Sequence, residues 1–193
     1  MSIFAEKIFK FRSYTPLPFI VFMVIFQKAS IESMLIGFVL IIIGEYFRLW
    51  GVSYAGSETR TTGNVGGTYL VVSGAYAFVR NPLYIGNMLM YLGVGIMSMA
   101  LFPYLQIIAI AFFFFQYTLI INEEESFLLN KYGKIYENYC KTVPKLIPSW
   151  NKYQNPEIDQ PRYDIQAGLR SEKRTLQAIT IVILIIIIRY ISN

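Results

Sequence analysis

The stretch Asn81–Ile121, NPLYIGNMLMYLGVGIMSMALFPYLQIIAIAFFFFQYTLII, contains no charged residue. It divides into two apolar runs, Leu83 to Leu101 and Pro103 to Ile121, which little more than Phe102 separates. Each run approaches the roughly 20 helical residues that cross a bilayer core. Proline suits the first turn of a helix because the N–H that it lacks would have no partner there. We therefore predict a tight antiparallel hairpin of two transmembrane helices.

Three further apolar stretches flank this hairpin: Tyr14 to Gln27, Ser33 to Val52 and Thr175 to Ile191. The first is short, but Lys28 follows it where a signal peptide would have small residues, so we expect a retained span. Hydrophobic residues make up 55% of the chain and charged residues 15%, which suits one bundle in lipid. The sequence predicts an all-α, polytopic membrane helical bundle of about five transmembrane helices, a single domain over residues 1–193.

Basic residues set the expected orientation of this bundle. With the N-terminus in the cytoplasm, 15 of the 17 lysines and arginines fall on the cytoplasmic side, as the positive-inside rule requires. The polar segment 150–171 then forms a cytoplasmic loop before the last span. The net charge of +5 faces anionic lipid headgroups, and no separate basic domain indicates a nucleic-acid partner.

Histidine is absent from the chain, and Cys140 is the single cysteine. This composition excludes an internal disulfide and a four-cysteine zinc site, and it removes the commonest metal ligand and general base. We expect no metal site. We interpret Cys140 as a half-buried small residue because no histidine is present to activate its thiol. Any chemistry must therefore use other groups.

Glu45 and Arg48 lie three residues apart near the end of the second apolar stretch. That spacing puts them on one helical face, where they can neutralise each other. Ionisable residues in membrane helices often face the bundle interior and mark function, although a structural ion pair gives the same pattern. The glycine-rich loop that follows carries Glu58 and Arg60. Glycines allow a backbone to approach a ligand closely, but any turn also needs them.

Asn81 and Pro82 favour a helix start, with asparagine as the N-cap and proline as the first helical residue. The free amides of such a start can bind a carboxylate or phosphate, although Asn-Pro also begins ordinary helices. Glu123, Glu124 and Glu125 directly follow the second run of the hairpin. Because apolar residues recur after them, we expect an amphipathic helix with at least one glutamate pointing inward, rather than a solvated acidic face. Such a carboxylate beside a helix start would form a receptor for a zwitterion.

Two motifs resemble those of a known family. RNPLYIG, Arg80 to Gly86, is followed after one helical hairpin by the pair Glu124–Glu125 and by KYGKIYENYCKTVPKLIP, Lys131 to Pro148. This arrangement resembles the integral-membrane isoprenylcysteine carboxyl methyltransferase and phospholipid methyltransferase superfamily. The family pattern is Arg-His-Pro-x-Tyr-x-Gly, then Glu-Glu-x-x-Leu-x-x-x-Phe-Gly-x-x-Tyr. The likeness covers residues 36–148.

The resemblance implies an S-adenosylmethionine-dependent methyltransferase whose acceptor is a lipidic or prenylated small molecule, a carboxylate or an amine, that enters from the bilayer. It also implies that the cofactor binds at the cytoplasmic ends of the helices. The residues that it implies for cofactor binding are Gly74, Tyr76, Arg80, Asn81, Pro82, Tyr84, Glu124 and Glu125. The candidates for a catalytic role are Glu45, Arg48, Glu58 and Arg60.

Two departures from the family pattern matter for the chemistry. Asn81 replaces the motif histidine, so it can still form hydrogen bonds but cannot change charge near neutral pH. Ile120 stands where the isoprenylcysteine enzymes usually have an arginine that would neutralise a carboxylate substrate. Arg48 and Arg60 are candidates to replace that arginine. The alternatives to a methyltransferase are an NADPH-dependent membrane reductase of the sterol or steroid type and a non-catalytic membrane scaffold that keeps the fold.

Overall fold

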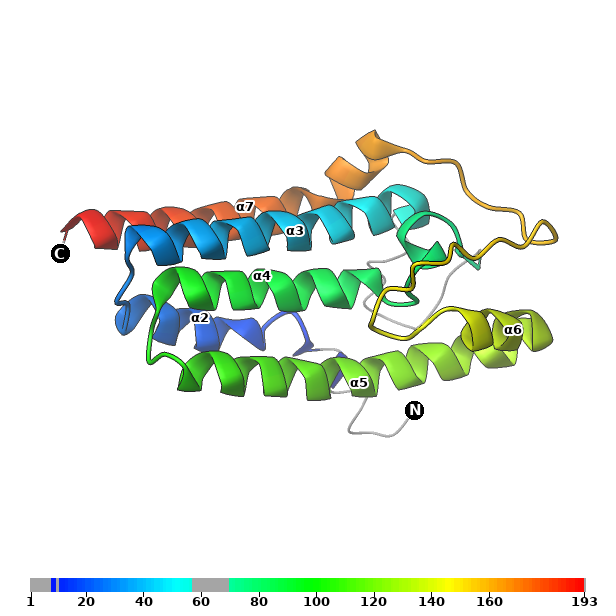
Figure 1. The fold of residues 1–193 in the computed structure, drawn as a ribbon, viewed down its shortest axis with the longest axis horizontal. Coiled ribbons are helices and arrows are strands. Elements are labelled where there is room, and N and C mark those ends of the chain that lie inside the picture. The colour runs from blue at the N-terminus through cyan, green and yellow to red at the C-terminus, as the bar shows by residue number, and fades with distance from the viewer. Residues whose placement is uncertain (1–7, 10, 57–69, 193) are drawn as a thin grey trace.

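The computed structural model describes residues 8, 9, 11–56 and 70–192, and this part of the chain is helical and contains no strand (Figure 1). Its main elements, in chain order, are α2 (Pro16–Ile25), α3 (Ile31–Ala55), the 3₁₀ helix η2 (Gly74–Ala77), α4 (Pro82–Ser98), α5 (Tyr104–Tyr132), α6 (Lys134–Thr142) and α7 (Ile165–Ser192). Each of the five predicted apolar stretches forms a helix. The prediction of an all-α bundle is confirmed.

Three of the described helices, α3, α5 and α7, are long and apolar enough to cross a membrane. Helix α4 is shorter, with 17 residues, and α2 has 10. At 1.5 Å per residue, α2 measures about 15 Å, which is about half of the hydrocarbon core. Large apolar side chains such as Ile42, Phe114 and Leu184 are exposed on the long helices, where they meet lipid. The protein is therefore an integral membrane protein.

Helices α3 and α4 pack closely in the centre of the bundle and run antiparallel (Figure 1). Their contact is made by glycines: a Cβ on Gly44 would lie 2.6 Å from the carbonyl oxygen of Gly86, and a Cβ on Gly93 would lie 2.7 Å from that of Gly37. On each helix the two glycines are seven residues apart and therefore lie on one face. Small residues allow such close backbone approach in membrane helices. This contact fixes the two helices whose ends carry the candidate site.

The hairpin of α4 and α5 is as tight as predicted, with Pro103 at the N-cap position of α5. The side-chain amide of Gln106 donates to the carbonyl oxygens of Gly95 and Ala100 at 2.8 and 3.2 Å, so it satisfies carbonyls at the end of α4. Helix α5 continues without a break through the three glutamates. Gly133, with a φ of 54°, ends α5, and α6 follows.

Helix α7 begins at Ile165, inside the segment that we predicted as a loop. Its first turns pack on the end of α3: Gly168 lies against the Ser53 side chain, and the backbone N–H of Asp164 donates to the Ser53 carbonyl oxygen at 2.9 Å. Hydropathy does not reveal this start because the first turns of α7 are polar. The extension brings residues before Thr175 into the bundle.

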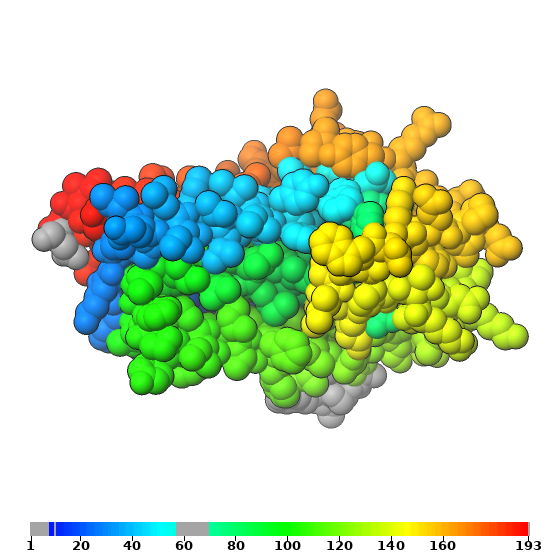
Figure 2. Space-filling view, viewed as in Figure 1, coloured from blue at the N-terminus to red at the C-terminus, as the bar shows by residue number. Residues whose placement is uncertain are grey.

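The irregular segments gather at one end of the bundle. In Figure 2, the segment that follows α6, coloured yellow, lies across this end of the molecule. Backbone bonds tie it to the chain around η2: Arg80 donates to Pro144 at 2.9 Å and Ser149 donates to Phe78 at 2.8 Å. A small hydrophobic core fills the space between them, formed by Leu70, Val72, Tyr136, Tyr139 and Val143. We call this region the polar end of the bundle, defined by η2, the start of α4, the end of α5, and α6.

Candidate functional site

Arg80 joins three elements of the polar end. Its Nε lies 3.1 Å from the Glu125 Oε1 on α5, and its Nη1 donates to the carbonyl oxygen of Cys140 on α6 at 3.1 Å. Glu125 also pairs with Lys145, whose Nζ lies 3.0 Å from Oε2. The Arg80 side chain is only 11% exposed. Arg80 therefore braces the start of α4 against α5 and α6, and Cys140 contributes its backbone to that brace.

Glu124 faces α4 from the neighbouring position on α5. The Tyr84 hydroxyl donates to its Oε1 at 2.8 Å, and both side chains line the same cavity. Glu123 does not line that cavity. The helix therefore presents Glu124 and Glu125 to the interior, and the expectation of an inward glutamate is confirmed.

Asn81 occupies the N-cap position of α4, but its side chain makes no capping hydrogen bond. Its amide instead donates to the carbonyl oxygen of Lys145 at 3.1 Å and lies 3.5 Å from the Glu125 Oε1. The expected capping bond is therefore absent, because the segment after α6 offers the amide a partner. Asn81 serves as a cross-link between α4 and that segment.

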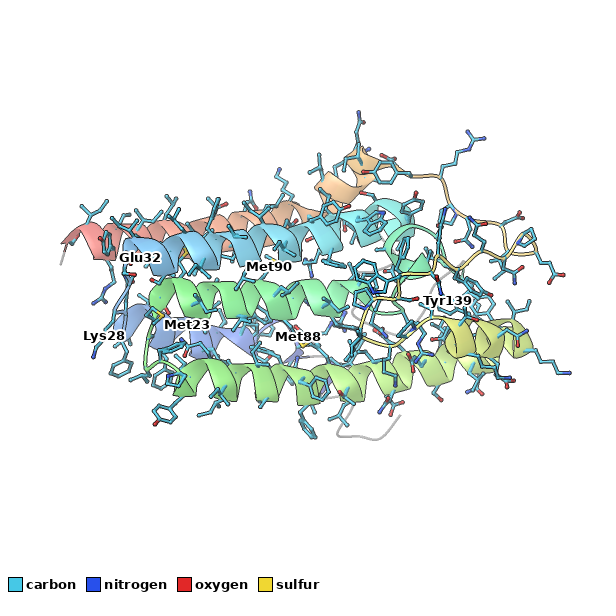
Figure 3. All side chains as sticks on the ribbon, viewed as in Figure 1. Met23, Lys28, Glu32, Met88, Met90 and Tyr139 are labelled. Carbon is cyan, nitrogen blue, oxygen red and sulfur yellow. The ribbon has the colours of Figure 1, made fainter. Side chains whose placement is uncertain are left out.

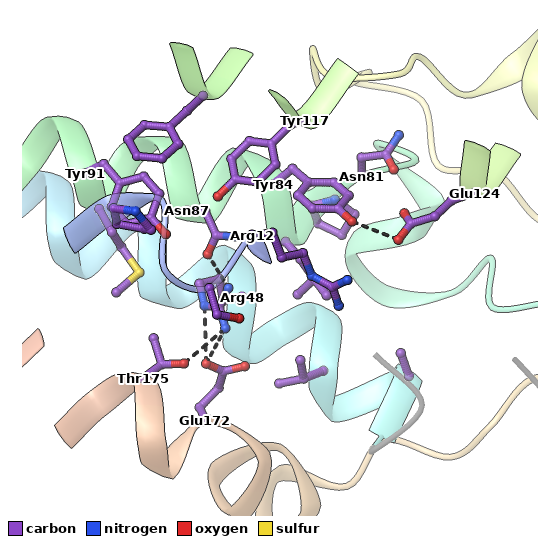
Figure 4. A pocket seen from close by; sticks show the side chains of 18 of the residues that line it. Arg12, Arg48, Asn81, Tyr84, Asn87, Tyr91, Tyr117, Glu124, Glu172 and Thr175 are labelled. Carbon is purple, nitrogen blue, oxygen red and sulfur yellow. Dashed lines mark hydrogen bonds and ion pairs between the residues drawn. The ribbon is translucent and has the colours of Figure 1, made fainter. Parts of the chain in front are cut away.

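A second charged cluster lies deeper, where α7 faces α3 and α4 (Figure 4). The Arg48 guanidinium donates through Nε and Nη2 to the Glu172 Oε2 at 3.2 and 2.6 Å, and through Nη2 to the Thr175 hydroxyl at 3.3 Å. Its Nη1 donates to the Asn87 Oδ1. Glu45, the predicted partner on α3, lies 3.8 Å away. Glu172 on α7 is therefore the closest carboxylate to Arg48, and sequence reasoning had not considered it.

A cavity of about 780 Å³ connects the two charged clusters, within the range of roughly 300–1,000 Å³ that is usual for small-molecule sites. Its lining on α4 extends from Asn81 to Val94, about 20 Å at 1.5 Å per residue. Figure 3 labels three of its lining residues: Tyr139 near the polar end, Met90 on α4, and Met23 far along the bundle. The polar end of the cavity holds carboxylates and phenols. The far part is apolar, with lining residues such as Met23, Val94 and Val182.

The structure brings most of the predicted residues together. The residues that line the cavity are Arg48, Tyr76, Arg80, Asn81, Pro82, Tyr84, Glu124 and Glu125. Glu45 lies behind Arg48, outside the lining. Gly74 also lies outside it: with a φ of 61° and the Tyr54 ring against its α-carbon, it allows the turn at η2. Glu58 and Arg60 lie outside the described residues.

Sequence reasoning missed several polar side chains of the cavity wall, namely Arg12, Asn87, Tyr91, Tyr117, Glu172 and Thr175. Three polar residues recur on one face of α4, because Tyr84, Asn87 and Tyr91 are separated by three and four positions. A polar stripe on an apolar helix is a signal that sequence analysis can use. In Figure 4, Arg12 lies between Arg48 and Glu124, and its guanidinium stacks 3.7 Å above the Phe9 ring.

Two buried tyrosines of the polar end, Tyr76 and Tyr139, remain neutral. Burial raises the pKa of Tyr76 above its usual value, and the nearby Glu124 raises it further. Burial likewise raises the pKa of Tyr139, whose hydroxyl donates to the Tyr76 carbonyl oxygen at 2.7 Å. Buried neutral phenols supply apolar ring faces and hydrogen-bond donors, but no charge. The charge at this end of the cavity is therefore set by arginines, Lys145 and the glutamates.

Ile120 is only 2% exposed and packs with Phe113 and Tyr117 in a hydrophobic cluster of α5. It does not line the cavity. An arginine at this position would have to leave that cluster to reach a ligand, so this chain uses position 120 for packing. Among the residues that the structure describes, no three His, Cys, Asp or Glu side chains gather in a way that could hold a metal ion.

Comparison with known proteins finds three relatives whose names indicate different functions. The cobalt-zinc-cadmium resistance protein CzcN of Cupriavidus metallidurans is 32% identical over 107 residues, 55% of this chain and 45% of CzcN. The Delta(14)-sterol reductase of Mus musculus is 36% identical over 101 residues, 50% of this chain but 22% of the reductase. The protein-S-isoprenylcysteine O-methyltransferase of Schizosaccharomyces pombe is 35% identical over 79 residues, 41% of this chain and 33% of that enzyme. The chain thus matches less than half the length of each of these relatives.

The family assignment comes from a longer match. The sequence pattern of the phospholipid methyltransferase family matches residues 33–135, just over half of the chain. The match takes in α3, α4 and α5, together with both glutamates that face the cavity. It ends before most of α6 and before α7. The chain belongs to the phospholipid methyltransferase family.

Proposed function

We infer that the protein is an S-adenosylmethionine-dependent methyltransferase of the membrane, and that its acceptor is a lipidic or prenylated small molecule that enters the cavity from the bilayer. The observation that carries this inference is a continuous cavity that is polar at one end and apolar at the other. Such a cavity can bind a polar cofactor at one end and an apolar acceptor at the other, with their reacting groups next to each other. Membership of the phospholipid methyltransferase family supports the same reaction class.

The residues at the polar end fit the chemistry of this cofactor. Its amino-acid part is a zwitterion, for which Glu124 and Glu125 offer carboxylates and Arg80 and the first amides of α4 offer donors. The buried phenol rings of the polar end, such as that of Tyr139, offer apolar faces for an adenine ring. S-adenosylmethionine supplies a methyl group that its sulfonium activates. The chain needs to orient the acceptor and exclude water, which by proximity lowers a barrier by roughly 7–11 kcal/mol in the best cases.

The acceptor is expected in the apolar part of the cavity. Phe19, Met23, Val94 and Val182 line this part, and an acyl or prenyl chain would bury its surface there. A carboxylate acceptor needs no general base, and an amine acceptor needs only to lose a proton. Of the four candidates for a catalytic role, Arg48 lines the cavity and Glu45 lies behind it, so a role for Glu45, Glu58 or Arg60 at the acceptor's head group stays a prediction. We expect the polar end at the cytoplasmic face, because the positive-inside rule favours the orientation that puts most basic residues there.

Calorimetry on the purified protein in detergent tests the cofactor. We expect saturable heat with S-adenosylmethionine and with its demethylated product, and none with NADPH. Binding of NADPH without S-adenosylmethionine would overturn the proposal in favour of a reductase. Binding of neither compound would favour a scaffold.

Transfer of isotope-labelled methyl groups tests the acceptor. Two probes separate the alternatives: farnesylated N-acetylcysteine offers a carboxylate, and vesicles of phosphatidylethanolamine offer an amine. Label that appears in one probe identifies the acceptor class. Cofactor binding with no label in either probe would contradict the proposed acceptor while leaving the cofactor assignment in place.

A further inference from the structure

We propose that Glu172 of α7 is a positioning residue: it fixes Arg48 and, through Arg48, Asn87 at the acceptor part of the cavity, so that α7 completes the acceptor site. This inference rests on the proposed methyltransferase function. It assigns a role to a helix that the family match does not include, since that match ends at residue 135 and α7 begins at Ile165.

Helix α7 forms one wall of the cavity. Its lining residues include Glu172, Thr175, Ile179 and Val182, whose spacing of three, four and three positions puts them on one helical face. Glu172 has no exposed surface, whereas its neighbour Lys173 is exposed. The wall changes along the helix from a carboxylate and a hydroxyl to aliphatic side chains. Helix α7 therefore contributes both polar and apolar surface to the cavity.

Arg48 is almost fully engaged by this arrangement. The bonds to Glu172, Thr175 and Asn87 use four of the five guanidinium N–H groups. A guanidinium needs two free, parallel N–H groups to hold a carboxylate in bidentate fashion. Arg48 therefore does not replace the family arginine as a carboxylate clamp. Its role is to hold the Asn87 amide in a fixed orientation. We call the guanidinium of Arg48 and the amide of Asn87 together the Arg48–Asn87 edge of the cavity wall.

The position of the pair along the cavity indicates what it serves. Asn87 lies three residues beyond Tyr84 on α4, about 4.5 Å further from the polar end. Tyr84 contacts Glu124 at the proposed cofactor end, and the lining becomes apolar from Met90 onward, Tyr91 apart. The Arg48–Asn87 edge thus lies at the junction of the two parts. A head group that enters from the apolar side meets this edge.

Stability alone does not account for the pair. A buried ion pair can usually be replaced by apolar residues of similar volume at little or no cost in stability. A carboxylate without exposed surface, on a helix with many apolar side chains exposed on its outer face, is accordingly explained better by a requirement for a fixed geometry. The geometry fixed here is that of the cavity wall, since both Arg48 and Glu172 line it.

Two variants and one control test the proposal. The assay measures transfer of label from S-adenosylmethionine to the probe that the parent methylates, either farnesylated N-acetylcysteine or phosphatidylethanolamine vesicles. Glu172→Gln keeps the shape and removes the charge. Arg48→Met combined with Glu172→Leu removes both charges of the closest pair, while the Glu45 carboxylate, 3.8 Å from the guanidinium in the parent, is kept. Lys173→Gln, on the exposed side of the same turn, is the control.

We expect both variants to raise the acceptor KM at least tenfold while the cofactor Kd changes less than twofold, and we expect the control to match the parent. A parental acceptor KM in the folded double variant would overturn the proposal. Equal loss of cofactor and acceptor binding would also overturn it, because general distortion has that effect. If neither variant folds, Glu172 is a folding element and the positioning role is refuted. Failure of the parent to bind S-adenosylmethionine would instead refute the proposed function.

Discussion

Two arginine–glutamate pairs stabilise the wall of the cavity, and they differ in their surroundings. At the polar end, Arg80 pairs with Glu125, which is 16% exposed and has Lys145 as a second partner. In the middle of the bundle, Arg48 pairs with Glu172, which has no exposed surface. The arginine side chains are equally exposed, at 11%. The difference therefore lies in the carboxylate: that of Glu125 keeps access to water, and that of Glu172 does not.

That difference predicts how each pair responds when one partner is removed. Removing one partner of a buried ion pair costs about 3–5 kcal/mol, whereas the loss is much smaller for a carboxylate that keeps access to water. The largest effect is therefore expected in the middle of the bundle, and smaller ones at the polar end.

Replacing Arg48 alone should have the largest effect. Arg48→Met leaves the Glu172 carboxylate buried without its guanidinium, and we expect the free energy of unfolding to fall by about 3–5 kcal/mol. The melting temperature in detergent measures this change. Arg170→Met removes an exposed arginine of α7 and should shift the free energy by less than about 0.5 kcal/mol. Equal melting temperatures for the two variants would show that the buried pair contributes nothing to stability.

The glutamates at the polar end should affect cofactor binding more than stability. Glu124→Gln or Glu125→Gln removes a charge-assisted partner of the cofactor, so we expect S-adenosylmethionine binding to weaken by about 1.5–3 kcal/mol. Calorimetry measures this change directly. Glu123→Gln is the matched control, because Glu123 lies on the same turn and does not line the cavity. If all three variants bind as the parent does, the acidic triplet is not part of the cofactor site.

The sequence was informative wherever the signal was local. Apolar runs and the proline at position 103 predicted the hairpin, and the motif at Arg80 together with the glutamate pair predicted the polar end. These residues are close in space because one tight hairpin connects them. Because the turn between α4 and α5 is short, the start of α4 and the end of α5 must lie side by side.

The middle of the bundle could not be predicted in the same way. Glu172 lies 124 positions after Arg48, in a turn of mixed charge that looks like a solvated segment. The glycines of α3 and α4 did carry a signal, because both pairs recur after seven residues, which predicts close helix packing. Which helix lies against which follows from the packing of the whole bundle, and one sequence does not contain that information in local form.

Asn81 offers the smallest and most discriminating change. The sequence predicted a side-chain cap for α4, whereas the structure shows the amide bonded to Lys145, 3.1 Å away. Asn81→Ser separates the two interpretations, since serine is a good N-cap but is too short to form the cross-link. If the cross-link is what stabilises this end, Ser and Ala variants should lose similar amounts, about 1 kcal/mol, in melting experiments. If Ser restores the parental melting temperature and Ala does not, the capping interpretation is correct.

The chemical role of position 81 is tested by the family residue. We expect Asn81→His to stay near the parental rate of methyl transfer, because a hydrogen-bonding residue is sufficient here and a carboxylate acceptor needs no base. If histidine acts as a proton acceptor, the rate should instead rise as pH increases through the histidine pKa of about 6.5, since the neutral imidazole is the active form. Rates measured from pH 5.5 to 8 for Asn81→His and the parent distinguish the two. A gain of tenfold or more that follows this titration would assign proton transfer to the position, and the parent protein would then lack that step.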